Sequence, residues 1–450
     1  EENMLLSFKM KNYKSFYNET NISMFADTAK RDFKDRLIKI YENKKVNKSI
    51  LPSMVIYGSN ASGKTSIISA INLLKQIIIS GTIKKQIKNR DINQLDICSF
   101  IHDSNKLKEP IHLEITFKTA ENIYNYFIDI IATYINTERK IVKEELNIIE
   151  YKSTGTSIKE EKINIFTRYE SKIELNKELE AISFFDKDEN NIKEIEKMEE
   201  NFSENLDKED LFLTTGFKSM ISLKMSNDIL DWFQEKLVTV VDFNEKEPII
   251  RFSDSEDKET TIFMNKQLDN LIKLADFGPQ KIGYVKDNDT GEYMLNSIYI
   301  PRNSKGELAI NSKIVESRGT VKLIDFWMGF MKYFQNGGIF VLDEFDCSIH
   351  PELVIGIIDL FNNKEINKNN AQLIFNTHNP LYLYKKIFRR DQIMFVEKDE
   401  DTYISSVYKL SDIDLRNDAN YMKNYFEGRL GALPFIDFES VLDTKEGAEE

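Results

Sequence analysis

The sequence predicts an α/β protein in which a mixed sheet lies beside an antiparallel β subdomain and carries a helical insertion. Three observations lead to this fold class. A glycine-rich loop at 58–65 lies between an apolar run, 54–57, and a helix-like run, 67–79. Apolar and polar residues alternate between 111 and 130, which is typical of antiparallel strands. From 171 to 210, fourteen acidic residues stand against six lysines, with apolar residues at helical spacing, which favours an acidic helical segment.

The loop that begins at residue 58 fits the P-loop pattern. Two glycines at this spacing let backbone amides turn inward around phosphates, the Lys64 ammonium can reach the outer phosphates, and the Thr65 hydroxyl can ligate Mg²⁺. The alternative is a glycine-rich turn that only happens to end in a lysine, but the strand before it and the helix after it favour a P-loop. We therefore expect nucleotide binding by Gly58, Asn60, Gly63, Lys64, Thr65 and Ser66.

Length and composition predict a globular protein without membrane segments. A chain of 450 residues suggests two or three domains, and 41% hydrophobic with 30% charged residues is typical of soluble proteins. The first residues have neither the basic start nor the apolar stretch of a secretory signal, and no later run reaches membrane-spanning length. Two cysteines are too few for a disulfide framework or a four-cysteine metal site. A cytoplasmic location is the simplest expectation.

A second buried strand is expected at 338–342, directly before two acidic residues. This is the Walker B arrangement: Asp343 can fix the water shell of a Mg²⁺ ion that a P-loop hydroxyl holds. Glu344 points the other way and can orient or deprotonate an attacking water. An apolar run followed by two acids is a weak signal alone, but in a chain with a P-loop it indicates hydrolysis of a nucleoside triphosphate.

Two further features complete the expected site. The run 372–376 predicts a buried strand, and His378 follows it at the edge where open α/β sheets place ligands, so its imidazole could hydrogen-bond a terminal phosphate. The other three histidines lack comparable context. Ser317 and Gly319 lie in a polar loop before an apolar-periodic helix, and such a helix start is a second anion site. Two phosphate-binding helix ends favour a dimer in which each nucleotide is covered by the neighbouring protomer.

The order of these motifs resembles the ABC-type ATPase heads of the RecF, OLD and structural-maintenance-of-chromosomes (SMC) group. More narrowly, the chain is similar to stand-alone bacterial ATPases of abortive-infection and phage-defence operons, such as the AbiL and PARIS ATPases. The resemblance covers both ends of the chain well and residues 150–285 poorly. It rests on Asn12-Tyr13-Lys14-Ser15-Phe16, Glu316-Ser317-Arg318-Gly319-Thr320, Asp343-Glu344-Phe345-Asp346 with His350-Pro351, Thr377-His378-Asn379-Pro380 and Tyr425-Phe426-Glu427-Gly428-Arg429-Leu430-Gly431-Ala432-Leu433-Pro434.

The resemblance implies an ABC-type P-loop ATPase head with three parts. Residues 1–150 would form its N-terminal half with the P-loop and a β-meander, 151–285 an acidic helical insertion, and 286–450 its C-terminal half with the signature loop, Walker B strand and switch histidine. It also implies that Ser317 and Gly319 engage the γ-phosphate bound to the other subunit, that Asp346 begins the D-loop at the dimer seam, and that Lys14 approaches the nucleotide. Gln76, Gln86 and Gln94 remain alternatives for the glutamine loop.

The expected function is that of a Mg²⁺-dependent ATPase that forms a homodimer or higher homo-oligomer around ATP. By resemblance, it would sense or regulate a separate effector, a nuclease or toxin, in antiviral defence. An in-chain Toprim nuclease is not expected, because Asp186-Lys187-Asp188 follows no buried strand and Asp287-Asn288-Asp289 is typical of a hairpin turn. GTP is disfavoured, since no Asn-Lys-x-Asp motif occurs.

The alternative is a RecF-like DNA-binding ATPase in DNA repair or DNA-end recognition. A net charge of −13 disfavours this hypothesis, although it leaves nucleic-acid binding possible. Small basic clusters occur, one of them at Lys385, Lys386, Arg389 and Arg390. We expect these side chains to be solvated rather than to form a nucleic-acid footprint.

Overall fold

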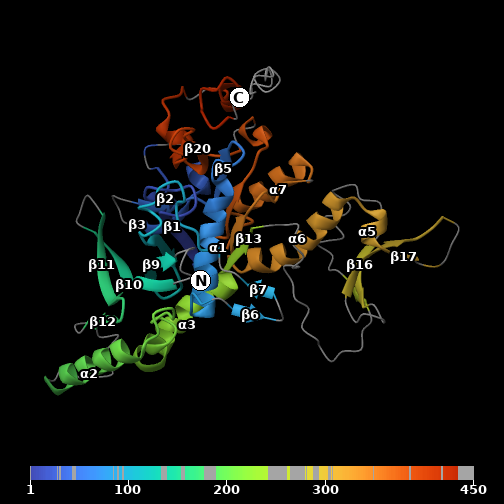
Figure 1. Cartoon of the computed structure of the whole chain (residues 1–450). Helices are drawn as coiled ribbons and strands as arrows, with labels where there is room; N and C mark the ends of the chain where they lie inside the picture. The colour runs from blue at the N-terminus through green and yellow to red at the C-terminus, as the bar shows by residue number, and fades with distance from the viewer. Residues whose placement is uncertain are drawn as a thin grey trace, which may run out of the picture.

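The mixed sheet and the flanking antiparallel sheet are both present in a computed structural model of the chain, which confirms the predicted fold class (Figure 1). The elements run in chain order from blue to red in this view. The structure describes residues 2–27, 29, 32–42, 47–84, 86–88, 91–93, 96–132, 139–153, 158–176, 189–241, 261–263, 279, 281–286, 293–302, 306, 308–347, 349–384, 387–416 and 419–433.

The central sheet places the P-loop strand between two parallel neighbours. Its order is β13-β18-β19-β5-β20-β21, and every neighbouring pair is parallel except β20 with β21. Strands β18 and β19 are buried throughout, as expected where helices cover both faces of a sheet. Parallel strands share one carboxyl edge, so the loops after β5, β18 and β19 lie near one another. The bounds are β5 (Ser53–Gly58), β13 (Leu237–Val240), β18 (Ile339–Leu342), β19 (Gln372–Asn376), β20 (Ile393–Lys398) and β21 (Ser405–Lys409).

Successive side chains of the central strands enter two separate hydrophobic cores. On β5, Met54 and Ile56 belong to the core that contains helix α1 (Lys64–Ser80). Val55 and Tyr57 belong to the opposite core, with helices α6 (Arg318–Gln335), α7 (Pro351–Asn362) and α8 (Tyr421–Phe426). The sheet is therefore covered on both faces, while its carboxyl edge remains accessible.

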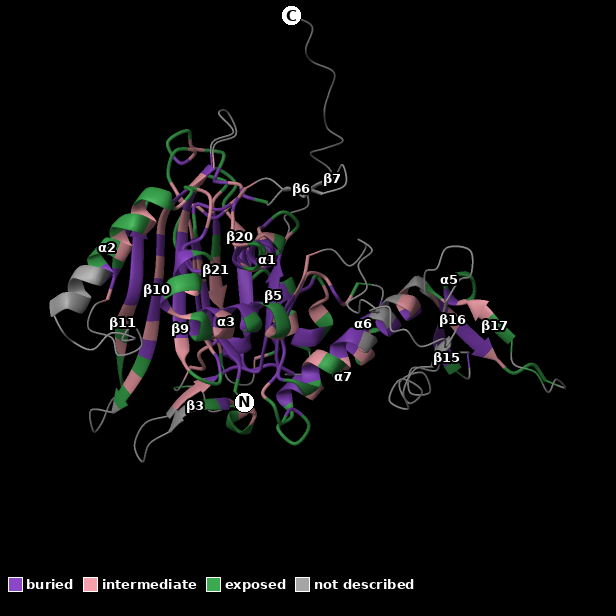
Figure 2. Ribbon diagram, turned by 90° about the horizontal axis from the view of Figure 1, so that it is seen from below, coloured by how far each residue is buried: buried purple, intermediate pink, exposed green. Residues whose placement is uncertain are grey.

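The flanking sheet is antiparallel throughout and packs on α1. Its order is β12-β11-β10-β9-β8-β1-β2. The Gln372 side chain joins it to the central sheet, because its Oε1 accepts the Leu5 N–H at 2.6 Å. Figure 2 shows buried residues along the strands of both sheets. The bounds are β1 (Met4–Lys11), β2 (Thr20–Ser23), β8 (Ile111–Lys118), β9 (Ile123–Ala132), β10 (Arg139–Ser153), β11 (Ile158–Tyr169) and β12 (Lys172–Leu175).

The range 151–285, expected to be an acidic helical insertion, contains strands as well as helices. Strands β11 and β12 extend the antiparallel sheet, because β11 pairs with β10 and β12 pairs with β11. The helical part consists of α2 (Glu189–Asn205), η2 (Phe217–Ile221), α3 (Leu223–Asp231) and η3 (Trp232–Lys236), and β13 then returns to the central sheet. Exposed residues follow the outer side of α2 (Figure 2). The division into three domains stays a prediction.

The remaining elements are small. A four-stranded antiparallel sheet lies beside α5 (Ser312–Val315) at the right of Figure 1. Its strands are β14 (Thr261–Phe263), β15 (Lys281–Lys286), β16 (Tyr293–Tyr299) and β17 (Leu308–Asn311). Two hairpins are formed by β3 (Ile38–Glu42) with β4 (Asn47–Ile50) and by β6 (Gln86–Lys88) with β7 (Asp91–Asn93). The short helices are η1 (Lys34–Arg36), η4 (Pro380–Leu383), η5 (Arg390–Gln392) and η6 (Leu410–Asp412).

A buried ion pair anchors the helical part to the antiparallel sheet. Glu144 and Arg168 are both fully buried, with Arg168 Nη1 3.7 Å from Glu144 Oε2. Glu144 also accepts the backbone N–H groups of Phe212 and Leu213 at 2.8 and 2.9 Å, while Arg168 donates to the Asp207 carbonyl at 3.1 Å. Because each charge has several partners, the segment 207–213 is fixed to the sheet.

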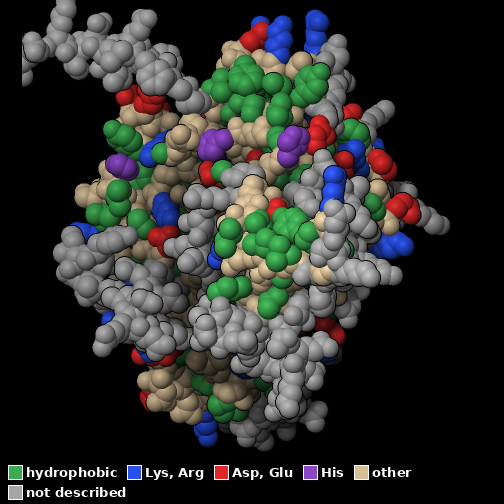
Figure 3. Space-filling model, turned by 90° about the vertical axis from the view of Figure 1, so that its right-hand side faces the viewer, with side chains coloured by type: hydrophobic (Ala, Val, Ile, Leu, Met, Phe, Trp, Pro, Cys, Tyr) green, Lys and Arg blue, Asp and Glu red, His purple; other side chains and the backbone are tan. Residues whose placement is uncertain are grey.

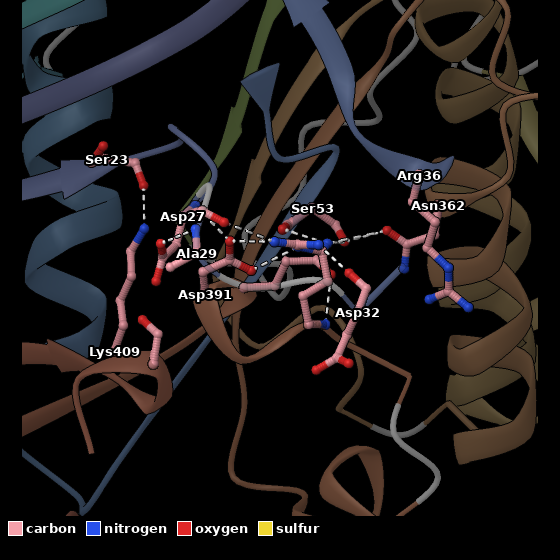
Figure 4. A network of polar contacts seen from close by, with 12 residues as sticks. Ser23, Asp27, Ala29, Asp32, Arg36, Ser53, Asn362, Asp391 and Lys409 are labelled. Atoms are coloured by element: carbon pink, nitrogen blue, oxygen red, sulfur yellow. Dashed lines mark hydrogen bonds and ion pairs between the residues drawn. The ribbon is translucent and has the colours of Figure 1, made fainter. Parts of the chain in front are cut away.

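The basic cluster expected to be solvated is partly buried. Arg389 is 1% exposed, and its guanidinium forms two 2.9 Å bonds to the Asp391 carboxylate. It also donates to the carbonyls of Asp27 and Asp32, and the Asp27 N–H donates to Asp391, so this network ties the start of the chain to η5 (Figure 4). Arg390 is also buried. The prediction of a solvated cluster is therefore wrong for Arg389 and Arg390, while the other two members, 385 and 386, lie outside the described residues.

Candidate functional site

The P-loop curls around the Lys64 side chain. Lys64 begins α1, and its Nζ donates to the carbonyls of Gly58 and Ser59, both at 2.9 Å. Gly63 caps the helix with a φ of 114°, and a Cβ there would lie 2.9 Å from Ser15 Oγ. Only glycine fits this position without strain, because its backbone is left-handed and its surroundings leave no room. The free amides at the start of α1 can therefore face a phosphate.

The Walker B carboxylate lies next to the P-loop hydroxyl, as the sequence suggests. Thr65 Oγ1 is 3.1 Å from Asp343 Oδ1, although 278 residues separate them. Burial raises the pKa of Asp343, and the nearby Glu344 charge acts in the same direction, while hydrogen bonds from Asn376 and Thr65 lower it. A hydroxyl and a carboxylate are oxygen donors of the kind that Mg²⁺ prefers, so these two side chains fit that ion. Among the described residues no group of three or more His, Cys, Asp or Glu could hold a metal by itself.

Glu344 and His378 face each other across the carboxyl edge of the sheet. His378 Nε2 is 3.3 Å from Glu344 Oε1, and both side chains are nearly half exposed. Burial and the Lys64 charge lower the pKa of His378, with Glu344 and Asp346 opposing this shift. A neutral imidazole can therefore act as hydrogen-bond donor or acceptor beside the carboxylate at neutral pH.

Asn376 forms hydrogen bonds with both Asp343 and Glu344. Sequence patterns do not identify this residue. Its Oδ1 accepts the Glu344 N–H at 2.7 Å, and its Nδ2 donates to Asp343 Oδ1. Glu344 has a φ of 45°, an uncommon conformation for a non-glycine residue, and the Asn376 bond supports it. The only local signal is its place at the end of the strand that precedes His378. One residue later, the Thr377 hydroxyl donates to Asp346 at 2.6 Å, which joins the proposed D-loop to the same strand end.

Several of these residues line one open cavity with a volume of about 480 Å³. Asn60, Lys64, Thr65, Ser66, Glu344 and His378 contribute to it, as does Lys14 from the Asn12–Phe16 motif. Lys14 forms an ion pair with Asp96, and its backbone N–H donates to the Cys98 carbonyl at 2.9 Å. The structure therefore places Lys14 beside the P-loop, and its approach to a nucleotide stays a prediction.

Lys64 is the cation at the centre of the P-loop. Burial lowers its pKa to about 8, while the charges of Glu344 and Asp343 act in the opposite direction. A phosphate placed at the loop would favour the charged form again, because an opposite charge within a few ångströms stabilises the ammonium.

Ser317 and Gly319 do not line this cavity within the described residues. Ser317 caps α6, and its Oγ accepts the Thr320 N–H at 3.1 Å. Figures 1 and 2 agree that the start of α6 lies beside α5, away from the P-loop helix. The turn at Ser317 and the P-loop are therefore separate within one protomer. Of the three glutamine candidates, Gln76 is exposed on α1 and Gln86 lies in β6, while residue 94 lies outside the described residues.

The fold and the cavity together define a P-loop nucleotide-binding protein. A family model described as "AAA domain, putative AbiEii toxin, Type IV TA system" matches residues 53–383, and the chain belongs to this family. The SMC head domain from Thermotoga maritima is similar in structure, with 13% sequence identity, coverage of 91% of this chain and 99% of that chain, and a TM-score of 0.36. No curated protein matches the sequence. Within the described residues, no helix is long and apolar enough to span a membrane.

Proposed function

We propose that the protein is a Mg²⁺-dependent ATPase that closes around ATP as a dimer. The observation that carries the proposal is the convergence of Lys64, Thr65 and Glu344 at one cavity on the carboxyl edge of the parallel sheet. The Asp343 carboxylate lies 3.1 Å from the Thr65 hydroxyl. These groups follow two strands, β5 and β18, that are distant in sequence, and their chemistry matches phosphoryl transfer.

Each side chain has a distinct proposed role. Lys64 and the amides at the start of α1 bind the phosphates, and Thr65 with Asp343 would hold Mg²⁺. The ion, when bound, neutralises charge on the phosphate oxygens. Glu344 accepts a proton from the attacking water, and His378 orients Glu344 through the contact of 3.3 Å. Asn376 keeps the Asp343 carboxylate and the Glu344 backbone in place.

Two substitutions test the assignment. Lys64→Ala should abolish ATP binding, because the buried ammonium is the only lysine enclosed by the loop among the described residues. Glu344→Gln should preserve binding and reduce turnover by about 10²- to 10⁴-fold, the usual contribution of a general base. Binding is measured by calorimetry and turnover by phosphate release. The exposed Glu427→Gln is a control for charge loss. A fully active Glu344→Gln enzyme would remove Glu344 from the mechanism.

The position of the Ser317 turn supports the proposed dimer. Ser317 opens an exposed helix end, and Ile314 and Val315 just before it are 76% and 40% exposed. Figure 3 shows the side of the molecule that carries α5, where hydrophobic side chains gather in groups with histidines between them. Apolar side chains beside an unused anion site favour contact with a second copy rather than with solvent.

Mixed protomers test this arrangement. Lys64→Ala and Ser317→Asp should each be inactive alone; aspartate can still cap α6 but repels a phosphate. When the two variants are mixed, a heterodimer has one intact P-loop facing one intact signature loop. About a quarter of wild-type turnover should return, since half of the dimers are mixed and each has one good site of two. No recovery on mixing would contradict a shared site.

We propose further that this ATPase regulates a separate effector, a nuclease or toxin, in antiviral defence. The support is the family description, which names a toxin of a toxin–antitoxin system, together with the motif resemblance. Purification from the native host with and without ATP, followed by mass spectrometry, should identify a co-purifying protein whose retention depends on ATP. DNA that binds more tightly with ATP and is released by salt would favour the RecF-like alternative instead.

A further inference from the structure

The cavity extends beyond the P-loop to a wall formed by residues 98–102. Cys98, Ser99, Ile101 and His102 all line it, and Lys398 lies on the same side. Ile101 is 58% exposed, although it is a large apolar residue in a cavity whose other lining is largely polar. None of these residues has a role in phosphate binding or hydrolysis in the mechanism above.

Asn12 holds this wall beside the P-loop. It is fully buried with a left-handed φ of 55°, and its Oδ1 accepts the Phe100 N–H at 3.2 Å. Its Nδ2 donates to the carbonyls of Lys106 and Glu109 at 2.9 and 3.0 Å. One side chain thus fixes both ends of the segment that contains Ile101 and His102. Asn12 belongs to the same five-residue motif as Lys14, so the motif supplies a cation and positions the wall.

His102 is held in a defined orientation with free hydrogen-bonding capacity. Its ring stacks on Tyr403, with centroids 4.5 Å apart and an interplanar angle of 18°, and the edge of Phe100 packs at 5.4 Å. Among the described residues, neither ring nitrogen of His102 has a hydrogen-bond partner. An imidazole whose face is covered presents its polar edge, and Ile101 next to it presents an apolar surface.

We propose that this wall binds the base of the nucleotide: Ile101 packs against the ring, and His102 hydrogen-bonds its polar edge. Tyr403 and Asn12 act as positioning residues. The proposal rests on the proposed ATP site, because the P-loop orients the phosphates so that the remainder of the molecule extends along the cavity. A flat ring with polar atoms at its rim matches one apolar and one hydrogen-bonding neighbour.

The test compares ATP with inorganic tripolyphosphate, which lacks a base. In the double variant Ile101→Ser/His102→Ala, ATP affinity should fall on the order of tenfold, the usual scale for loss of base contacts, while tripolyphosphate affinity stays at the wild-type value. If wild-type protein bound neither ligand, the ATP site itself would fail. If the variant bound ATP like the wild type, the site would stand and the wall would have no role.

Two further variants test whether Tyr403 and Asn12 position the wall or only stabilise the fold. Tyr403→Ala should reduce the ratio of ATP to tripolyphosphate affinity, whereas Tyr384→Ala, which removes an exposed tyrosine outside the cavity, should not change it. Asn12→Ala should lower the same ratio in the fraction that remains folded, as judged by its thermal transition. Equal losses for both ligands in Asn12→Ala would show that Asn12 supports only the fold and would overturn its positioning role.

Discussion

We expect ATP affinity to fall in mild alkali, because Lys64 loses its proton there. In the protein without ligand, burial lowers the pKa of this ammonium to about 8. ATP binding favours the charged form, so protein above this pH must take up a proton before it binds. The charged fraction falls from about 0.9 at pH 7 to about 0.1 at pH 9. We therefore expect ATP affinity to decrease about tenfold across this interval.

Calorimetry measures both the decrease in ATP affinity and the proton uptake that accompanies binding. Titrations at about pH 7, 8 and 9, in two buffers of different ionisation enthalpy, give the affinity and the number of protons taken up. The phosphates of ATP are already ionised over most of this range, and His378 does not interfere, because burial and the Lys64 charge keep its pKa below the ordinary value. Proton uptake should be largest at the alkaline end.

Lys75 provides a matched control on the same helix. Burial also lowers its pKa to about 8, but its Nζ donates to the Leu237 carbonyl and lies away from the cavity. Lys75→Met should leave the pH profile of ATP binding unchanged, whereas Lys64→Arg should flatten it, since arginine stays charged. Affinity that is constant from pH 7 to 9 in the wild type would refute the assignment of the phosphate-binding cation.

Three other substitutions have defined outcomes. Asn376→Asp places a carboxylate against Asp343, so the free energy of unfolding in urea should fall by about 2 kcal/mol relative to wild type between pH 5 and 8. An unchanged free energy of unfolding in this interval would contradict the contact. Burial lowers the pKa of His112, but hydrogen bonds to two carboxylates outweigh this and raise it to about 9. Its stabilisation is therefore present below about pH 6.5 and lost as the pH rises through 9, and His112→Gln should cost about 2 kcal/mol in urea unfolding at pH 6 but little at pH 10. Arg389→Met leaves the Asp391 carboxylate buried without its partner and should lower the free energy of unfolding by about 3–5 kcal/mol, whereas a loss below 1 kcal/mol would indicate that the network is not rigid.

Sequence patterns predict the parts of the site that are encoded in short, continuous segments of the chain. The strand and helix around the P-loop, the strand before Asp343 and the strand before His378 all lie where periodicity places them. In each case a run of apolar residues ends in a polar group at a sheet edge, and the pattern is complete within about ten residues of sequence. The chemical roles of these residues stay predictions.

The parts that were missed depend on contacts between distant segments. Asn376 is an ordinary polar residue until β18 lies beside β19, and His102 becomes part of the cavity only because Asn12 fixes its segment. The sequence predicts a solvated Arg389 for the same reason, because its partners Asp27 and Asp32 lie more than 350 residues away. Charge clusters in a sequence do not reveal which charges are buried.

Strand β13 connects the helical part to the strand that precedes Asp343. The chain leaves η3 directly into β13, which pairs with β18, and the Asp343 N–H donates to the Val240 carbonyl at 2.9 Å. At the other end, Trp232 of η3 packs against Phe117 of the antiparallel sheet, with ring centroids 4.3 Å apart. A rigid shift of these helices must therefore break the Val240 bond or carry Asp343 with it. Suppose that a partner molecule binds the helices more tightly in one of two positions. Linkage then requires that this partner changes the affinity for ATP by the same factor by which ATP changes the affinity for the partner.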